Sequence, residues 1–243
     1  MKKFLVCGCV LVASVVSASA ADLPFKAPVR AVPVAYDWTG FYIGVHVGGG
    51  WADKHWFDTT TLTLDEGSHT ASGWLAGGQI GYNRQIGAWV FGIEVQASAA
   101  DLTGSAVSNV FPTDRIASRV DALGTFAGRI GYGWDRALLY VKGGGAWAHD
   151  KFSITDIPTG ITYARFDQTH LGWMLGLGFE YGITRNWSAK VEYNYMDLGT
   201  ERSINVICNP NFGCIGPGGS FNEDVAQRIQ LVKFGVNYRF GAP

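Results

Sequence analysis

Hydrophobic and polar residues alternate along most of the chain from Trp38 onward. A period of two is typical of a β-strand, because successive side chains point to opposite faces. The clearest run places six large apolar residues on one face: Leu171, Trp173, Leu175, Leu177, Phe179 and Tyr181. Comparable runs begin near Phe41, Trp74, Trp89, Val120, Leu139, Trp187 and Val232. The pattern therefore predicts eight strands.

The connections between these runs alternate in length. Short ones fall at 86–87, 135–136 and 184–186. Long polar or glycine-rich ones fall at 53–72, 103–117, 156–168 and 204–222. An even number of strands with short periplasmic turns and long external loops is typical of outer-membrane barrels. In that arrangement both termini are periplasmic.

Aromatic residues gather at two levels of the predicted strands. One set lies beside the short turns: Tyr82, Trp89, Tyr132, Trp134, Tyr181, Trp187, Tyr238 and Phe240. The other lies beside the long connections: Trp51, Trp74, Trp147 and Tyr195. Two such levels match the aromatic girdles at the two faces of a membrane. The alternative is a soluble lipocalin-type barrel, which also has eight strands but turns its apolar face inward.

Composition favours the membrane protein. Charged residues make up 16% of the chain, against roughly 25% in a typical soluble domain. Beyond the first twenty residues no apolar run approaches the roughly 18 residues of a membrane-spanning helix. A membrane protein without such helices must close a β-barrel, because lipid cannot satisfy an open sheet edge. We therefore expect an all-β, eight-stranded, antiparallel up-and-down transmembrane β-barrel over residues 38–243.

The start of the chain has the pattern of a secretory signal peptide at residues 1–20. Two lysines precede an apolar stretch at 4–16, and a small-residue cleavage motif ends at Ala20. A lipoprotein signal is the alternative, since Cys7 and Cys9 are nearby, but they lie at the front of the apolar stretch rather than its end. Residues 21–37 contain three prolines and predict an extended periplasmic lead-in.

Removal of the signal leaves two cysteines, Cys208 and Cys214, in the last long connection. An exported protein meets an oxidising compartment, where two nearby cysteines form a disulfide. Two free thiols are the alternative. No spacing of cysteine and histidine predicts a zinc site, and we expect neither a metal nor a cofactor.

Several segments together resemble the alphaproteobacterial outer-membrane immunogenic proteins, also called porin-family proteins. They are Ala21–Pro24 with Trp38–Gly44, Tyr140–Trp147, Trp187–Gly199 and Lys233–Phe240. The resemblance implies a Gram-negative outer-membrane surface antigen in contact with outer-membrane lipid and lipopolysaccharide. Barrels of this kind usually end on an aromatic residue that the outer-membrane assembly machinery reads. Here Gly241, Ala242 and Pro243 follow Phe240, so the chain departs from that pattern.

If the apolar faces meet lipid, the opposite faces line the lumen. They carry eight charged residues of both signs: Glu94, Arg129, Lys142, Glu180, Lys190, Glu192, Lys233 and Arg239. Eight strands enclose just enough room for side chains, and an unpaired buried charge costs several kcal/mol. We therefore expect a lumenal charge network that braces the barrel and conducts few ions. A narrow porin is the alternative, because seven lumenal glycines would leave room for water: Gly44, Gly48, Gly92, Gly144, Gly172, Gly176 and Gly178.

Other chemistry is weakly indicated. His149, Asp150 and His170 lie near one hairpin, but no nucleophile motif accompanies them, so we expect no enzyme. The resemblance implies haemin as a candidate ligand, because some relatives in this family bind it, and His55 and His69 of the first long connection are the candidate contacts. The alternative is that these two histidines are ordinary loop residues without a ligand. No basic stripe suggests nucleic acid.

Overall fold

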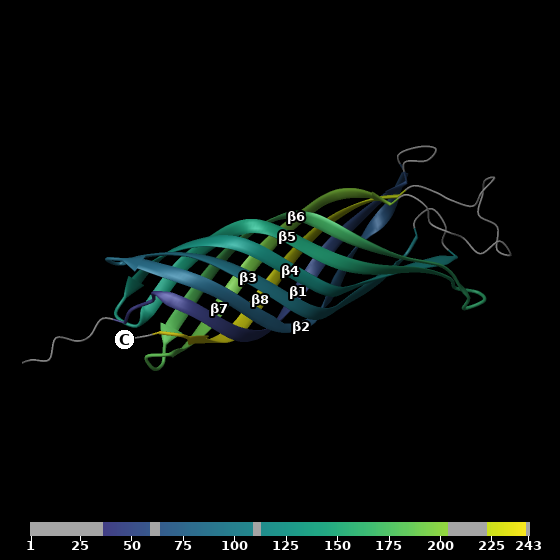
Figure 1. Ribbon diagram of the computed structural model, residues 1–243. Coiled ribbons are helices and arrows are strands. Elements are labelled where there is room, and N and C mark those ends of the chain that lie inside the picture. Colours follow the sequence, from purple (N-terminus) through teal and green to yellow (C-terminus); the bar gives the residue numbers. More distant parts are fainter. Residues whose placement is uncertain (1–35, 59–63, 109–112, 204–222, 242–243) are drawn as a thin grey trace, which may run out of the picture. The chain divides into compact units, whose positions relative to one another are not determined.

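The computed structural model describes residues 36–58, 64–108, 113–203 and 223–241. The predicted signal peptide, most of the lead-in, and both Cys208 and Cys214 lie outside these residues. The described part is a closed antiparallel barrel in which each strand pairs with the next and β8 returns to β1 (Figure 1). Its strands are β1 (Gly40–Asp58), β2 (Leu64–Ile86), β3 (Trp89–Val107), β4 (Asp114–Trp134), β5 (Ala137–Asp156), β6 (Thr162–Gly182), β7 (Trp187–Ser203) and β8 (Glu223–Arg239). The predicted eight-stranded up-and-down barrel is confirmed.

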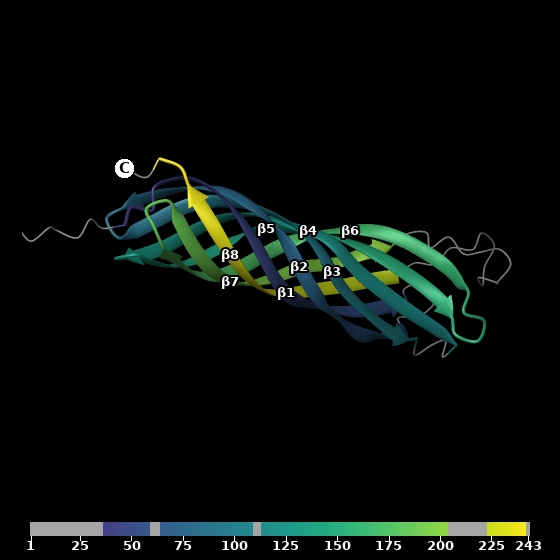
Figure 2. The same ribbon diagram turned by 90° about the horizontal axis from the view of Figure 1, so that it is seen from below.

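The three short connections also lie where the sequence predicts them. β2 turns into β3 at Gly87, whose φ is 62°, and β4 turns into β5 at Asp135, whose φ is 51°. Glycine and aspartate are among the residues that tolerate this left-handed conformation. The Phe240 amide donates to Phe41 O at 2.8 Å. Both ends of the described barrel therefore lie with these turns, at what we call the turn end; the opposite end is the loop end (Figures 1 and 2).

The long connections are shorter than the sequence predicts. β1 and β2 remain paired up to Asp58 and Leu64, inside the predicted 53–72 connection, and β5 and β6 remain paired up to Thr155 and Thr162. The strands run for 17 to 23 residues, whereas about 9–11 cross a membrane. Beyond the lipid a strand no longer needs an apolar face, so the backbone keeps its pairing while the sequence loses its signal.

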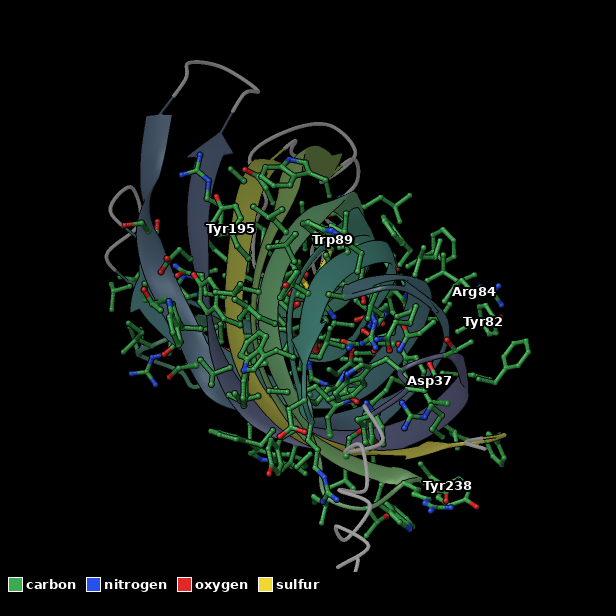
Figure 3. All side chains as sticks on the ribbon, turned by 90° about the vertical axis from the view of Figure 1, so that its left-hand side faces the viewer. Asp37, Tyr82, Arg84, Trp89, Tyr195 and Tyr238 are labelled. Carbon is green, nitrogen blue, oxygen red and sulfur yellow. The ribbon has the colours of Figure 1, made fainter. Side chains whose placement is uncertain are left out.

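The apolar faces point outward. Leu171, Val45 and Phe41 are 67%, 66% and 63% exposed, although each is apolar. Aromatic pairs border this apolar belt: Trp89–Tyr132 and Trp187–Tyr238 toward the turn end, with ring centroids 5.5 and 5.1 Å apart, and Trp173–Tyr195 toward the loop end at 5.7 Å. Figure 3 shows the side chains that fill the ring of strands and those that project from it, such as Tyr82 and Tyr238. The soluble alternative with an apolar interior is therefore excluded. None of the described residues forms a helix long and apolar enough to cross a membrane.

Toward the loop end the barrel wall divides into two sheets. The described pairing of β2 with β3 stops at Ser72 and Thr103, and that of β6 with β7 stops at Trp173 and Asp197. The other neighbouring strands remain paired beyond these points. The loop end therefore consists of two four-stranded sheets, β7–β8–β1–β2 and β3–β4–β5–β6.

Candidate functional site: the barrel lumen

The centre of the lumen holds a network of buried ion pairs. Glu94 accepts from Lys142 at 3.0 Å and from Lys190 at 3.1 Å. Glu192 lies 3.1 Å from Lys190 and 3.2 Å from Lys233, and it also pairs with Lys142. The side chains of these residues are at most 1% exposed. Because each lysine reaches a carboxylate, the burial of these charges is compensated.

Arg129 connects the third carboxylate to this network. Its Nη1 lies 3.5 Å from Glu180 and 3.8 Å from Glu94. The guanidinium also lies between two tyrosine rings, 4.8 Å from the centroids of both Tyr42 and Tyr140. Their hydroxyls donate to Glu94 and to Glu192, each at 2.9 Å. The structure thus joins seven of the eight predicted lumenal charges.

The eighth, Arg239, lies outside the network. Its guanidinium stacks over Tyr36 at 4.3 Å and Trp38 at 5.5 Å. Its Nη2 donates to Arg185 O at 2.8 Å. It is near the last turn of the barrel, too far along β8 from Lys233 to share the central carboxylates. Alternation correctly predicts that Arg239 points inward, but it does not give the depth of the side chain in the lumen.

Uncharged side chains extend the hydrogen bonding on both sides of the network. Gln96 Nε2 donates to Glu94 at 2.8 Å, and Asn237 Nδ2 donates to Glu180 at 2.8 Å. His46 bonds Gln79 at 2.5 Å and Ser98 at 2.7 Å. These residues and the two tyrosines are not among the predicted site residues, although their inward positions follow from the same alternation.

The lumenal glycines accommodate neighbouring side chains rather than leaving open channels. A β-carbon at Gly178 would collide with the ring of Tyr140, and one at Gly81 would collide with that of Tyr42. At Gly176 it would collide with Asn194 and Lys142. These three glycines therefore make room for large polar side chains of the network, whereas a β-carbon at Gly48, Gly144 or Gly172 would collide with the backbone of a neighbouring strand.

Apolar layers lie on both sides of the ionic centre. Toward the loop end, fifteen buried residues from both sheets form one cluster: Ala52, Ala71, Leu75, Ala100, Leu102, Val120, Leu123, Ala127, Ala146, Ala148, Met174, Met196, Leu198, Ile229 and Leu231. Toward the turn end, Trp38, Val90, Leu138 and Tyr140 form a second cluster, against which Tyr36 packs. A continuous aqueous path through the described lumen would have to cross both clusters.

Beyond the first apolar cluster, a second buried ion pair joins the two sheets. Lys54 of β1 donates to Asp150 of β5 at 2.5 Å, and both side chains are 0% exposed. Gln227 of β8 donates to the same carboxylate at 3.4 Å, and the Lys54 ammonium lies 4.7 Å from the Phe152 centroid. We call Lys54 and Asp150 the cross-lumen pair. It connects the two sheets at the level where the barrel wall has divided.

The three residues considered for catalysis do not converge. His149 points outward and bonds Asp121 at 2.7 Å, whereas Asp150 and His170 point into the lumen. Adjacent residues of one strand face opposite sides, so His149 and Asp150 cannot share a site. His170 Nε2 lies 3.8 Å from Asp150. Within the described residues no group of three histidine, cysteine, aspartate or glutamate side chains is placed to hold a metal ion.

Of the two candidate haemin contacts, the structure describes the side chain of His69 alone. Its Nε2 lies 2.7 Å from Ser118 Oγ of the opposite sheet. Burial, and next the charge of Lys54, lowers the pKa of His69 from 6.5 to about 4. The backbone of His55 in β1 pairs with Ser68 of β2 and Ala226 of β8, and its side chain is outside the described part. Haemin binding at these residues stays a prediction.

Comparison with known proteins agrees with the barrel. Residues 9–240 match the family model of the outer membrane protein beta-barrel domain. The 31 kDa outer-membrane immunogenic protein of Brucella melitensis is 34% identical over 92% of this chain and 94% of its own length. The 22 kDa outer membrane protein of Rhizobium leguminosarum is 28% identical over 71% of this chain and 68% of its own. Among solved structures, the outer membrane protein OprG of Pseudomonas aeruginosa matches with a TM-score of 0.46 and 13% identity, over 84% of this chain and 98% of its own.

These names describe outer-membrane proteins and immunogenic proteins, and the family name describes a barrel domain rather than an enzyme. The family match covers most of the sequence, and the relative at 34% identity extends over nearly its whole length. The resemblance drawn from sequence segments is therefore confirmed. The chain is a Gram-negative outer-membrane protein that belongs to the outer membrane protein β-barrel family.

Proposed function

We propose that this protein is a structural and surface-exposed barrel of the outer membrane, with a filled, non-conducting lumen that contributes to envelope integrity. The observation that carries the proposal is the stacking of an ionic centre between two apolar clusters. Ions would have to leave water to cross either cluster. The loop-end cluster consists of alanine, valine, leucine, isoleucine and methionine, and in the turn-end cluster the Tyr140 hydroxyl is already bonded to Glu192.

The ionic centre is better suited to bracing than to selecting solutes. Its lysines and carboxylates bond one another from strands on opposite sides of the lumen, such as Lys190 of β7 with Glu94 of β3. Moving one charge toward a solute would leave its partner buried and unpaired, which costs several kcal/mol. The network therefore favours one rigid barrel shape, as a membrane scaffold requires.

The proposal includes an orientation. The turn end faces the periplasm and the loop end faces outside, as in other outer-membrane barrels. The strands then project beyond the lipid and carry their connections into the surroundings of the cell, where loops on a rigid scaffold serve recognition. Lipid, lipopolysaccharide and the assembly machinery are the partners we propose. We propose no enzymatic activity and no nucleic-acid partner.

Liposome swelling tests the filled lumen. Refolded protein is placed in liposomes that contain an impermeant polymer, and swelling is recorded in isotonic solutions of a pentose, an amino acid and a small salt. We expect rates equal to those of protein-free liposomes, with an open porin as the positive control. Swelling that falls with increasing solute size would establish the narrow-porin alternative. A heat-modifiable shift on gels shows that the refolded sample is a barrel.

Detergent sensitivity tests the role in the envelope. Deletion of the gene is expected to increase killing by bile salts, and the wild-type gene is expected to restore resistance. Unchanged resistance in the deletion strain would remove this role while leaving the filled lumen as a separate result.

A further inference from the structure

Two grooves lie on the outer wall of the barrel, on the loop-end side of the apolar belt. One has a volume of about 630 Å³ and runs over β3, β4, β5 and β6. The other has a volume of about 500 Å³ and involves β8, β1 and β2. Each therefore belongs to one of the two sheets into which the wall divides.

The two grooves differ in charge. The groove over β3–β6 is lined by three cations, Arg119, Lys151 and Arg165, and by one acid, Asp167. The outward charged side chains of the other groove are one acid, Asp53, and one cation, Arg228. We call the first of these the cationic groove. Its remaining lining includes the hydroxyl residues Thr103, Ser105 and Ser153 and the small residue Ala117.

Acids just outside the cationic groove neutralise part of its charge. Arg119 Nε lies 3.0 Å from Asp101, and Lys151 Nζ lies 2.6 Å from Asp121. Asp121 also contacts His149. The side chains of Arg119 and Lys151 remain 54% and 52% exposed. A guanidinium has five N–H donors and an ammonium has three, so both retain donors that point into solvent.

Arg165 is exposed and forms no ion pair with the described side chains. Arg119 and Lys151 are direct cross-strand partners in the β4–β5 register. Like charges placed opposite each other destabilise a sheet unless something offsets their repulsion. A bound anion would complete the compensation that the acids begin.

The groove lies just outside the aromatic level that borders the apolar belt. Lys151 follows Trp147 on the same outward face of β5, and Trp147 belongs to the aromatic level that borders the apolar belt. Four residues of a strand tilted by roughly 40° rise about 10 Å along the membrane normal. Arginine and lysine side chains can bend back toward the interface over several ångströms. The three cations can therefore reach phosphates at the edge of the membrane.

We propose that the cationic groove binds the phosphorylated sugar headgroup of lipopolysaccharide in the outer leaflet. Arginine forks match phosphate oxygens, lysine adds a point charge, and the hydroxyls of Thr103, Ser105 and Ser153 suit a sugar. The inference rests on the proposed orientation, which places the loop end on the side that carries lipopolysaccharide.

Binding to the purified barrel tests the inference. Detergent-refolded protein is titrated with lipopolysaccharide, with the same lipopolysaccharide after removal of its phosphates, and with inorganic phosphate. The test variant is Arg119→Gln/Lys151→Gln/Arg165→Gln. The matched control is Arg228→Gln in the other groove. It removes an arginine that is 65% exposed, against 54% for Arg119, and that is likewise paired with an aspartate, Asp197, at 3.5 Å. A heat-modifiable gel shift confirms that each variant is folded.

We expect at least about tenfold weaker binding of intact lipopolysaccharide by the triple variant, since each of the three exposed charge contacts contributes roughly a factor of two to three. The Arg228→Gln control should bind within about twofold of wild type, and dephosphorylated lipopolysaccharide should bind all proteins equally weakly. Unchanged binding by the triple variant would overturn the inference. So would an equal loss in the control, or inorganic phosphate binding as tightly as lipopolysaccharide.

The single variant Arg165→Glu gives a second test, because no described acid is left unpaired by it. We expect a loss of binding in the same direction, and unchanged binding would contradict the inference. Protease accessibility of the loop end on intact cells tests the orientation separately. A wrong orientation and an inactive groove therefore give different results.

Discussion

The cross-lumen pair allows a sharp test of how the loop end is held together. Lys54→Met removes the ammonium and leaves Asp150 buried without its 2.5 Å partner. Both side chains are 0% exposed, so water cannot replace the lost contact at the surface. Breaking such a buried pair from one side costs about 3–5 kcal/mol, whereas removing both charges is often neutral.

Three variants separate these contributions. We expect Lys54→Met to lower the free energy of unfolding by about 3–5 kcal/mol, and Lys54→Met/Asp150→Leu to recover most of that loss. The exposed pair of Arg228 with Asp197 provides the matched control, and Arg228→Met should cost about 0–1 kcal/mol. Equilibrium urea unfolding of the refolded barrel in detergent, followed by tryptophan fluorescence and by the gel shift, gives all three values.

The position of the effect is as informative as its size. Because the pair joins two sheets whose facing edges are no longer paired at this end, Lys54→Met should also increase hydrogen exchange in β6 between Thr162 and Gly172, and leave the turn end unchanged. A loss below about 1 kcal/mol in Lys54→Met would refute the reasoning. So would a double variant that is less stable than the single one.

Three further predictions follow from the lumen, its loop-end rim and the cysteines. Gly178→Leu should destabilise the barrel by about 1–3 kcal/mol or prevent folding, because the space is filled by Tyr140, whereas Gly128→Leu on the open outer face should be tolerated in the same urea assay. The folded state lowers the pKa of His69 from 6.5 to about 4 and so favours the neutral ring. The contribution of His69 to stability is therefore present above pH 6.5 and is lost as the pH falls toward 4. The variant His69→Gln should make the urea midpoint less dependent on pH over that range. Finally, Cys208 and Cys214, the two cysteines outside the predicted signal peptide, should resist alkylation until a reductant is added, as read by mass spectrometry. Modification of both thiols without reductant would show that they are free.

Period-two alternation was sufficient to predict much of the fold. It gave the eight strands, the three short turns and the sets of residues, such as Leu171 with Trp173, that share one face. The low charge, the two aromatic levels and the alternating loop lengths then indicated that this face meets lipid. With the apolar face assigned to lipid, the same alternation predicted which charges point inward. Alternation does not tell how far along the barrel axis a side chain lies. The prediction therefore placed Arg239, which lies near the turn end, in one network with charges at the centre of the lumen.

The loop end was harder to predict for a physical reason. Strand residues such as Lys54 and Asp53 project beyond the lipid, where one face meets water and the other a mixed interior, so the apolar alternation stops while backbone pairing continues. The division into two sheets depends on where hydrogen bonding between β2 and β3 and between β6 and β7 ends. The point at which pairing ends depends on two strands together, so it cannot be read from the sequence of either strand alone.

The filled lumen is the central claim, and single-channel recording of the refolded barrel in a planar bilayer tests it most directly. The ionic centre and the apolar clusters on both sides predict a flat baseline at 100 mV in 1 M salt, a standard condition that reveals even narrow pores. Large, stable, uniform conductance steps that scale with the amount of barrel in the gel-shift assay would contradict the claim. They would show that ions cross the two apolar clusters of the described lumen.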